Sequence, residues 1–285
     1  MPSPTELPGA ILITGCSTGI GRATATRLAR LGYPVCATAR RVETLQTLAQ
    51  AGCQTLALDV TDEESIRAAL KAVEAEHGHV HALVNNAGYS QSGPVEEVTL
   101  ASLRRQFETN VFGAIRLCQL VLPGMRAAGA GRIVNVSSMG GRMTLPGGGA
   151  YHATKYALEA LSDALRYETK GFGIDVVVIE PGPVNTEFGT TANASVADQP
   201  EEGPYAEFMA GVDALVTKTY AKPPRGSARP EAIAEVIVTA ITTRRPRTRY
   251  LVGTTARALV GARAVLGDRN WDRFLATQYP KPPKS

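Results

Sequence analysis

Tyr151 and Lys155 stand four residues apart, and their types and spacing fit acid–base chemistry. On a helix, two residues at this spacing lie one turn apart on the same face. A lysine ammonium beside a phenol lowers the free-energy cost of ionising it, so the phenol can exchange a proton with a substrate oxygen near neutral pH. Ser138 lies upstream, and the glycine-rich residues 140–141 and 147–149 can return its hydroxyl to the tyrosine. Two residues on a solvated helix face would show the same spacing. Other parts of the chain must therefore show whether this pair is catalytic.

A glycine-rich turn near the start of the chain favours the chemical interpretation. Residues 10–14 form a short apolar run that predicts a buried strand, and Gly-Cys-Ser-Thr-Gly-Ile-Gly follows at 15–21. Residues 22–31 then show helical periodicity. Strand, glycine turn and helix are the context of a dinucleotide-binding turn, because glycines let the backbone approach a pyrophosphate and the helix start offers N–H groups to its charge. The Gly-x-x-x-Gly-x-Gly spacing is a variant of the usual fingerprint, and the alternative is a tight turn without a ligand.

The end of the second predicted strand, residues 34–39, indicates which dinucleotide binds. Arg40 and Arg41 follow it directly, and the first acid is Glu43, inside the next helix. Proteins of this build that use NAD place an acid near this point for the ribose 2′-hydroxyl, whereas an arginine accommodates a 2′-phosphate. The sequence therefore predicts NADP(H), with Arg40 as the main contact. The alternative is a solvated basic pair that opens a helix.

Polar residues also follow the third and fourth predicted strands, at residues 53–58 and from residue 82. Asp59 can meet the adenine edge of a cofactor, or it can cap the next helix, where Thr-Asp-Glu-Glu at 61–64 resembles a capping box. Asn85 and Asn86 need partners because unpaired buried amides cost about 1–3 kcal/mol each, so they either tie strands together or line a pocket. The small Ala87 and Gly88 leave room for a flat ring.

The remaining pattern completes an α/β fold. Residues 103–125 predict a long amphipathic helix that carries Asn110 beside its apolar stripe, with Pro123 bending or loosening its end. Further strands are expected at 132–137, 174–179 and 249–252, and helices at 204–220, 230–241, 255–266 and 270–279. Alternating strands and helices predict a Rossmann-type, doubly wound parallel sheet of about seven strands with helices on both faces. We expect one domain over residues 1–285, with a substrate lid at 187–229 and a helical extension at 253–285.

Composition narrows the classes of function. The net charge of +4 is too small to argue for nucleic acid, and no apolar run reaches the roughly 18 residues of a membrane span. The start of the chain has neither a basic region nor an apolar core, which predicts a short disordered lead and no secretory signal. Histidines at 77, 79 and 81 alternate along a turn and strand, which argues against a metal site. The arginines at 244, 245, 247, 249, 257 and 263 form a basic tail, interpreted as solvated and not as a site for an anionic partner.

The four cysteines, at 16, 36, 53 and 118, match no zinc or redox spacing. They predict reduced thiols in a cytoplasmic protein.

The motifs together resemble those of the short-chain dehydrogenase/reductase family. They are Thr14-Gly-Cys-Ser-Thr-Gly-Ile-Gly21, Asn85-Asn-Ala-Gly88, Asn110, Ser138, Tyr151-x-x-x-Lys155 and Pro181-Gly182, in that family's order and spacing. The resemblance covers residues 9–190, and it covers the C-terminal third only in outline, as the family's variable substrate region. Arg40 and the long tail resemble the branch of 17-beta-hydroxysteroid and retinol dehydrogenases. His81 departs from the family, which often has an acid there.

The resemblance implies a role for each catalytic residue. Tyr151 would be the general acid in reduction and the base in oxidation, and Lys155 would bind the nicotinamide ribose. Ser138 would polarise the substrate carbonyl, and Asn110 would hold a water that relays protons. No catalytic metal is expected. The cofactor contacts expected from the motifs and the resemblance together are Gly15, Ser17, Thr18, Gly19, Ile20, Gly21, Arg40, Arg41, Asp59, Val60, Asn86, Ala87, Gly88, Tyr151, Lys155, Pro181, Gly182, Val184 and Thr186.

The predicted function is an NADP(H)-dependent carbonyl reductase or alcohol dehydrogenase that acts on a hydrophobic ketone, aldehyde or alcohol. Apolar residues of the expected lid suggest that substrate class, namely Phe188, Tyr205, Phe208 and Met209. The alternatives are a non-catalytic NADP-binding sensor or regulatory protein, and an epimerase or dehydratase of the same fold. The resemblance also implies a homodimer or homotetramer, associated through the two long central helices. No nucleic-acid partner and no membrane span are expected.

Overall fold

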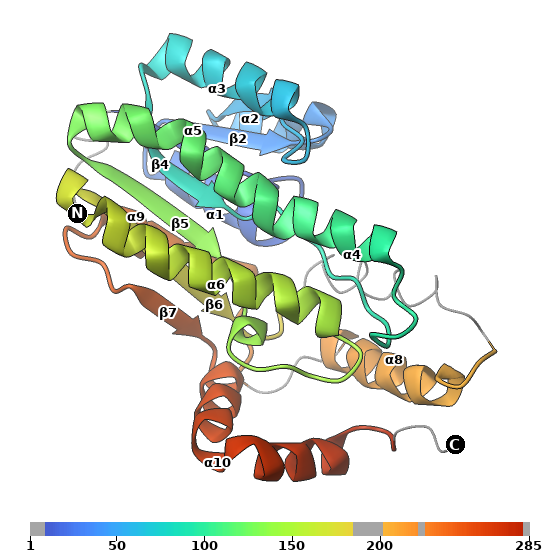
Figure 1. The fold of residues 1–285 in the computed structure, drawn as a ribbon. Helices are drawn as coiled ribbons and strands as arrows, with labels where there is room; N and C mark the ends of the chain where they lie inside the picture. Colours follow the sequence, from blue (N-terminus) through green and yellow to red (C-terminus); the bar gives the residue numbers. More distant parts are fainter. Residues whose placement is uncertain (1–8, 185–201, 222–225, 282–285) are drawn as a thin grey trace.

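The computed structural model describes residues 9–184, 202–221 and 226–281, and its centre is a parallel sheet (Figure 1). Among these residues the sheet has seven strands in the order β3-β2-β1-β4-β5-β6-β7. They are β1 (Ala10–Ile13), β2 (Val35–Ala39), β3 (Gln54–Ala57), β4 (Val80–Asn85), β5 (Gly131–Val136), β6 (Ile174–Pro181) and β7 (Arg249–Val252). All pair in parallel. The predicted doubly wound fold is confirmed.

The strands are apolar on both faces because helices cover both. β1, β2 and β5 are buried along their whole length, as parallel strands between two helix layers require. The third strand is shorter than predicted, because the Cys53 amide donates to Leu48 at the end of the preceding helix and does not join the sheet. Cys53 and the other three cysteines are free and buried.

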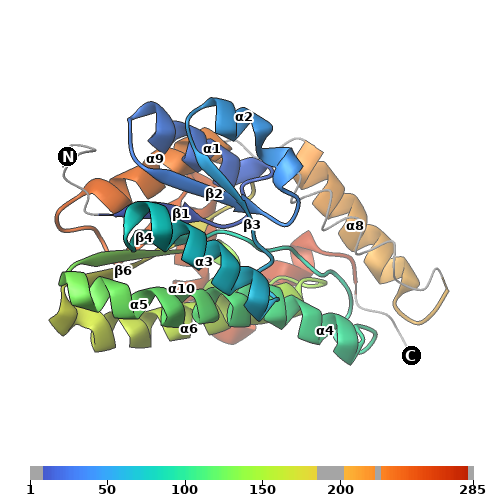
Figure 2. The same cartoon turned by 90° about the horizontal axis from the view of Figure 1, so that it is seen from above.

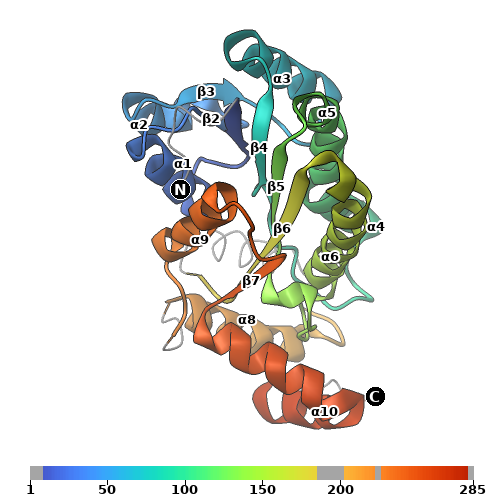
Figure 3. The same cartoon turned by 90° about the vertical axis from the view of Figure 1, so that its left-hand side faces the viewer.

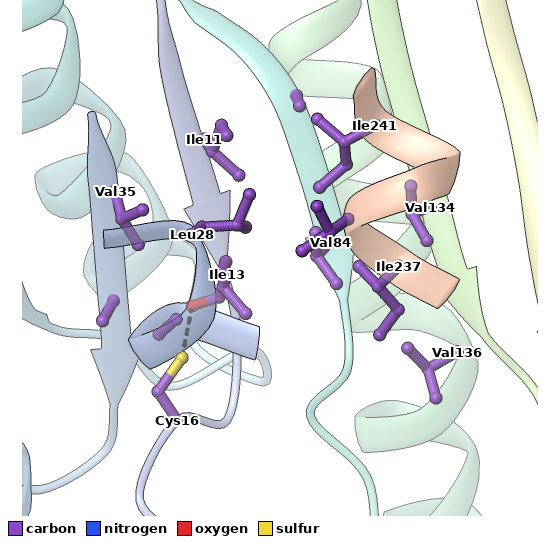
Figure 4. Close-up of a cluster of buried hydrophobic side chains, with 14 of the residues drawn as sticks. Ile11, Ile13, Cys16, Leu28, Val35, Val84, Val134, Val136, Ile237 and Ile241 are labelled. Carbon is purple, nitrogen blue, oxygen red and sulfur yellow. Dashed lines mark hydrogen bonds between the residues drawn. The ribbon is translucent and has the colours of Figure 1, made fainter. Parts of the chain in front are cut away.

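Two layers of helices lie on opposite faces of the sheet (Figure 3). One face carries α1 (Gly19–Arg30), α2 (Gln46–Gln50) and α9 (Pro230–Thr242), and the other carries α3 (Glu63–His77), α4 (Leu100–Phe107), α5 (Gly113–Ala128) and α6 (Gly149–Thr169). Figure 4 shows the core on the first face, where Leu28 and Ile237 pack on strand residues such as Ile13 and Val84. A separate core on the second face includes Leu117.

The predicted long helix is continuous but irregular. A π-helical turn, η3 (Glu108–Phe112), joins α4 to α5 and contains Asn110. Such turns are rare and often mark functional sites. The helix continues through Pro123 to Ala128 and ends at Gly129, whose φ is 64°. Pro123 therefore does not end it.

One helical stretch among the described residues, Leu100–Ala128, is long and apolar enough to cross a membrane, with a mean hydropathy of 1.2 in its best window. Length and composition are weak evidence, since the core helix of a protein passes the same test. Here Leu117, Val121 and Met125 of this stretch belong to the core beneath the sheet. In total 39% of its most apolar 18 residues are buried, so one side of the stretch packs in the core and the rest is partly or fully exposed.

Two C-terminal helices stand beyond the carboxyl ends of the strands (Figures 1 and 2). They are α8 (Ala206–Ala221) and α10 (Thr254–Gln278). The sequence predicted two short helices where α10 lies, and this is confirmed: Gly267, with φ 65° and ψ 176°, is not helical and divides α10 into two helices that meet at a kink. A third core, which includes Met139, Met143 and Trp271, packs α10 against the segment after β5.

Candidate active site

A cleft of about 1490 Å³ runs along the carboxyl edge of the sheet, from the glycine turn after β1 to α8 and α10. The strand order reverses between β1 and β4, and open parallel sheets bind ligands at such a reversal. Most of the predicted site residues lie around this one cleft.

The glycine turn is held in place by the end of β4. The Asn86 Nδ2 donates to the carbonyls of Thr14 and Gly15, at 2.9 and 3.0 Å, and the Thr14 hydroxyl accepts from the amides of Asn86 and Ala87. Gly15 has a φ of 70°. A Cβ at Gly21 would lie 2.4 Å from the Gly15 oxygen, so a side chain there would push the turn apart. Asn86 thus lines the cleft and ties two strand ends together.

Its neighbour Asn85 has only one of the two predicted roles, that of tying strands together. Its buried Nδ2 donates to Asn135 Oδ1 on β5 at 2.9 Å and to the carbonyl of Ala114 on α5 at 3.2 Å. Asn85 is not part of the cleft lining, and these bonds tie β4 to the neighbouring strand and to a helix.

An exposed basic pair stands where β2 ends. Arg40 and Arg41 both line the cleft directly after Ala39. Arg22 of α1 reaches towards the same corner and donates to the carbonyl of Thr44 at 3.5 Å. Three guanidinium groups therefore lie near the second strand end, at the position where a nucleotide's ribose would rest on this kind of fold.

Asp59 also lines the cleft, and the capping interpretation of this region needs a correction. The Asp59 carboxylate accepts from the amide and hydroxyl of Thr61, at 2.9 and 2.8 Å. The N-cap of α3 is Asp62, whose carboxylate accepts from the Glu64 amide. The predicted cap by Asp59 or by a box starting at Thr61 is wrong, because α3 begins at Glu63, one residue later than a cap at Thr61 requires.

Tyr151 and Lys155 lie in the first two turns of α6, and both line the cleft. The Lys155 Nζ is 5.7 Å from the centre of the Tyr151 ring and donates to the Val136 carbonyl at 2.9 Å. An ammonium has three N–H groups, so this bond leaves capacity for a ligand hydroxyl. Burial lowers the pKa of the Lys155 ammonium to about 8, and the Glu159 carboxylate one turn on opposes that shift. The lysine can therefore gain or lose its proton within the pH range of ordinary enzyme assays.

Ser138 follows β5 in extended backbone and caps a short turn, η4 (Met139–Gly141), by accepting from the Gly140 amide at 3.0 Å. A Cβ at Gly140 would lie 2.4 Å from the His152 ring and 3.4 Å from the Ser138 Oγ. The turn thus packs directly on the residue after Tyr151. The His152 Nδ1 accepts from the Leu145 amide, and burial lowers the pKa of His152 to about 4.

Asn110 is buried behind the cleft and does not line it. Its Nδ2 donates to the Tyr89 carbonyl at 2.9 Å and to the Thr154 hydroxyl at 3.1 Å, and its Oδ1 accepts from the Tyr89 amide. Thr154 in turn donates to the Tyr151 carbonyl. Asn110 therefore connects the loop after β4 to the first turn of α6.

Most of the predicted residues contribute to the cleft. Its lining includes Gly15, Ser17, Thr18, Gly19, Ile20, Arg40, Arg41, Asp59, Val60, Asn86, Ala87, Gly88, Ser138, Tyr151, Lys155, Pro181, Gly182 and Val184. Gly21 and Asn110 lie behind the lining, and Thr186 is outside the described residues.

The apolar end of the cleft differs from the prediction. Phe188 is outside the described residues, and Tyr205, Phe208 and Met209 do not line the cleft. Tyr205 instead donates to the Glu96 carboxylate at 2.6 Å. The walls come from other residues of α8 and α10, namely Val212, Leu215, Val216, Thr219, Leu259, Phe274, Leu275, Gln278 and Tyr279. Steps of three and four along α8 were the sequence signal for its cleft-facing side.

Comparison with known proteins agrees with this geometry. Residues 9–197 match the family described as short chain dehydrogenase. The chain belongs to the short-chain dehydrogenase family. It is 36% identical over 266 residues to an Escherichia coli protein named uncharacterized oxidoreductase YbbO, covering 93% of both chains. It is 34% identical over 252 residues to a 3-ketodihydrosphingosine reductase of Bacteroides thetaiotaomicron, covering 88% of this chain and 90% of the other.

A solved structure of similar fold is the closed form of serine dehydrogenase complexed with NADP+. The TM-score is 0.75 with 28% identity, over 86% of this chain and 95% of that one. Together these similarities make the chain an oxidoreductase of the type that uses NAD(P).

Proposed function

We propose that the protein is an NADP(H)-dependent oxidoreductase that interconverts a hydrophobic ketone or aldehyde and the corresponding alcohol. The observation that carries the proposal is that Ser138, Tyr151 and Lys155 line the same cleft as the glycine turn. A hydroxyl, a phenol and a buried ammonium beside a dinucleotide cradle are the groups that carbonyl reduction needs for orientation and for proton transfer.

The cradle fits a dinucleotide. A Cβ at Gly21 or Gly15 would meet backbone atoms within 3 Å, so only glycines let the turn close around a pyrophosphate. Arg40 and Arg41 at the end of β2 support NADP(H), because a guanidinium binds a phosphate in a bidentate manner and no acid occupies the strand end. The bound nicotinamide would supply the hydride.

The chain's own residues handle the substrate oxygen. In reduction, Ser138 donates a hydrogen bond to the carbonyl oxygen, and Tyr151 gives that oxygen a proton as the hydride arrives. The Lys155 ammonium stabilises the resulting phenolate through space. In oxidation, the same phenol oxygen removes the proton from the alcohol.

We propose that Asn110 acts by position. Its amide hydrogens bind the Tyr89 carbonyl and Thr154, which fixes the start of α6. Its Oδ1 and the Lys155 Nζ lie 3.1 and 3.9 Å from the place that a Cβ would take at Gly88. Both groups therefore border Gly88, which supports the proton relay from Lys155 that the family resemblance implies.

The walls of α8 and α10 support an apolar substrate. Their cleft-facing residues carry no charge, and Leu215, Val216, Leu259 and Phe274 are aliphatic or aromatic. The relative named for reducing 3-ketodihydrosphingosine acts on a lipid ketone, which is the same class. The fold itself does not decide the class, since a structure of this fold is named for serine. The proposed apolar substrate class therefore rests on the residues of α8 and α10 that line the cleft.

Two rival functions make different predictions. A cofactor-binding sensor would bind NADPH without turnover, and the complete set of Ser138, Tyr151 and Lys155 argues against it. An epimerase or dehydratase would recycle its cofactor.

We further propose a cytoplasmic homodimer or homotetramer, joined through α5 and α6, where Phe112 and Tyr156 are exposed.

The experiment is a screen of ketones and alcohols of increasing chain length, read by the absorbance of reduced nicotinamide with NADPH and NADH in parallel. We expect stoichiometric NADPH oxidation, with kcat/KM rising as the substrate becomes more apolar. Cofactor binding without any consumption across the panel would support a sensor, and product formation without net consumption would support an epimerase.

A further inference from the structure

Helix α6 carries a row of polar residues that extends beyond the pair at its start. Tyr151, Lys155, Glu159 and Asp163 follow one another at four-residue steps, so they lie on one face. Glu159 is buried, with 7% of its side chain exposed, whereas 48% of the Asp163 side chain is exposed. A carboxylate is therefore buried one turn beyond the active-site lysine.

Glu159 belongs to a group of ion pairs around Arg249, which also pairs with the surface carboxylate of Asp163 at 2.6 Å. The Arg249 Nε lies 3.0 Å from Glu159 Oε2 and 3.3 Å from Glu180 Oε1, and Arg142 donates to the same Glu180 oxygen at 3.1 Å. Only 2% of the Glu180 side chain is exposed. We call Arg142, Glu159, Glu180 and Arg249 the ion cluster.

The cluster joins the elements that carry the proposed chemistry. Arg142 follows the η4 turn that begins after Ser138, and Glu159 is on the helix of Tyr151. Glu180 directly precedes the Pro181–Gly182 segment predicted to contact the cofactor, and Arg249 is on the edge strand β7. One guanidinium thus links three structural elements that must keep a fixed geometry.

The contact between the turn and the helix is also tight. A Cβ at Gly141 would lie 2.9 Å from Glu159 Cγ, 2.9 Å from Ser137 Oγ and 3.1 Å from the Lys155 carbonyl oxygen. The glycine therefore lets the turn lie directly on the Glu159 stem. A small movement of Glu159 would move the turn that presents Ser138.

We propose that the ion cluster positions the Ser138 turn against the Tyr151 helix, an inference that rests on the function proposed above. Glu159 and Glu180 are positioning residues, since they touch neither substrate nor cofactor. Two of the three carboxylates that share the Arg249 guanidinium are buried, which is a costly way to fill a site, because well-packed apolar residues usually stabilise as much or more. In this protein the two carboxylates fix the orientation of the end of β6, the η4 turn and helix α6 relative to one another.

The test compares Glu159→Gln with the matched control Asp163→Asn. Both changes remove a carboxylate from Arg249 while keeping the side-chain shape, but Asp163 lies one turn further from Lys155 and at the surface. We expect Glu159→Gln to lower kcat about tenfold or more, because small misplacements of catalytic groups are costly. The dissociation constant for NADPH should stay close to the wild type, whereas the thermal midpoint should fall because Arg249 loses a buried partner. Asp163→Asn should leave kcat within about twofold, and Glu180→Gln should behave like Glu159→Gln.

A second measurement needs no turnover. The Gly140, Gly141 and Arg142 amides are hydrogen-bonded within the turn, so their hydrogen exchange reports its order. We expect faster exchange in this segment for Glu159→Gln than for Asp163→Asn. Equal exchange in the two variants, or a Glu159→Gln enzyme with wild-type kcat, would overturn the inference. If the wild type turned over no carbonyl compound while the exchange difference was present, the proposed function would fail and the positioning would stand.

Discussion

Replacing Lys155 with methionine removes the charge beside the proposed acid while keeping a flexible apolar stem. The ammonium lies 5.7 Å from the centre of the Tyr151 ring. At an effective dielectric constant of about 20, two unit charges at that separation attract by about 3 kcal/mol. Each 1.36 kcal/mol corresponds to about a tenfold change in rate, so losing this stabilisation of the phenolate should lower kcat about 100-fold.

The assay is single-turnover reduction with saturating NADPH, which separates the chemical step from any weaker cofactor binding. The matched control is Lys170→Met, at the exposed end of the same helix. Burial sets the pKa of Lys155 at about 8, so the wild-type rate should fall as pH rises through 8 and the ammonium is lost. The variant should lack that decline. A Lys155→Met rate within about threefold of wild type, or the same decline above pH 8, would refute the reasoning.

Three further changes test other parts of the site. Arg40→Asp should reverse the ratio of kcat/KM for NADPH and NADH, because a carboxylate repels a 2′-phosphate and accepts from a 2′-hydroxyl; an unchanged ratio would refute the phosphate assignment. Burial lowers the pKa of His152 to about 4, so the folded state stays neutral while the unfolded chain takes up a proton, and stability should fall as pH drops from 6.5 towards 4. In urea unfolding, His152→Gln should reduce that loss by about 3 kcal/mol, and an identical pH dependence would contradict the assignment. Gly21→Ala would place a Cβ 2.4 Å from the Gly15 oxygen and should weaken NADPH binding about tenfold or more in a fluorescence titration. The control is Gly171→Ala, where no atom lies within 4 Å, and equal affinities in the two variants would count against the cradle.

The order of strands and helices could be predicted because each strand is a short apolar run bounded by a turn. Helices cover both faces of β1, so all four of its residues are apolar and buried, and the run stands out in the sequence. The ends of the strands were harder to predict from the sequence. Cys53 looked like a strand residue, and only the structure shows its amide closing the helix before β3.

The site residues that follow strands could be predicted because parallel strands end at one edge. Ser138, Asn86 and Arg40 share the cleft for that reason. The apolar walls could not be located in the same way, because α8 lies within the long segment of weak pattern at 187–229 and α10 comes after the last strand of the sheet. Met209 was chosen for its type, yet the structure buries it and presents Val212 to the cleft.

Contacts between distant polar residues were the least accessible from the sequence. Arg249 looked like one of several solvated arginines near the chain end. The sheet order places it beside β6, where it meets the buried Glu159 and Glu180. The π-helical turn around Asn110 was likewise not predicted, because apolar residues continue at steps of three and four through it, as in a regular α-helix.

Tyr151→Phe is the most direct test of the claim that this tyrosine is the acid and base. The matched control is Tyr156→Phe, which removes a hydroxyl from an exposed residue of the same helix. With saturating NADPH and an apolar ketone, Tyr151→Phe should lose about 10²–10⁴-fold in the rate of hydride transfer, with cofactor affinity unchanged. Tyr156→Phe should turn over like the wild type. A Tyr151→Phe enzyme that kept more than about a tenth of the wild-type rate would contradict the account.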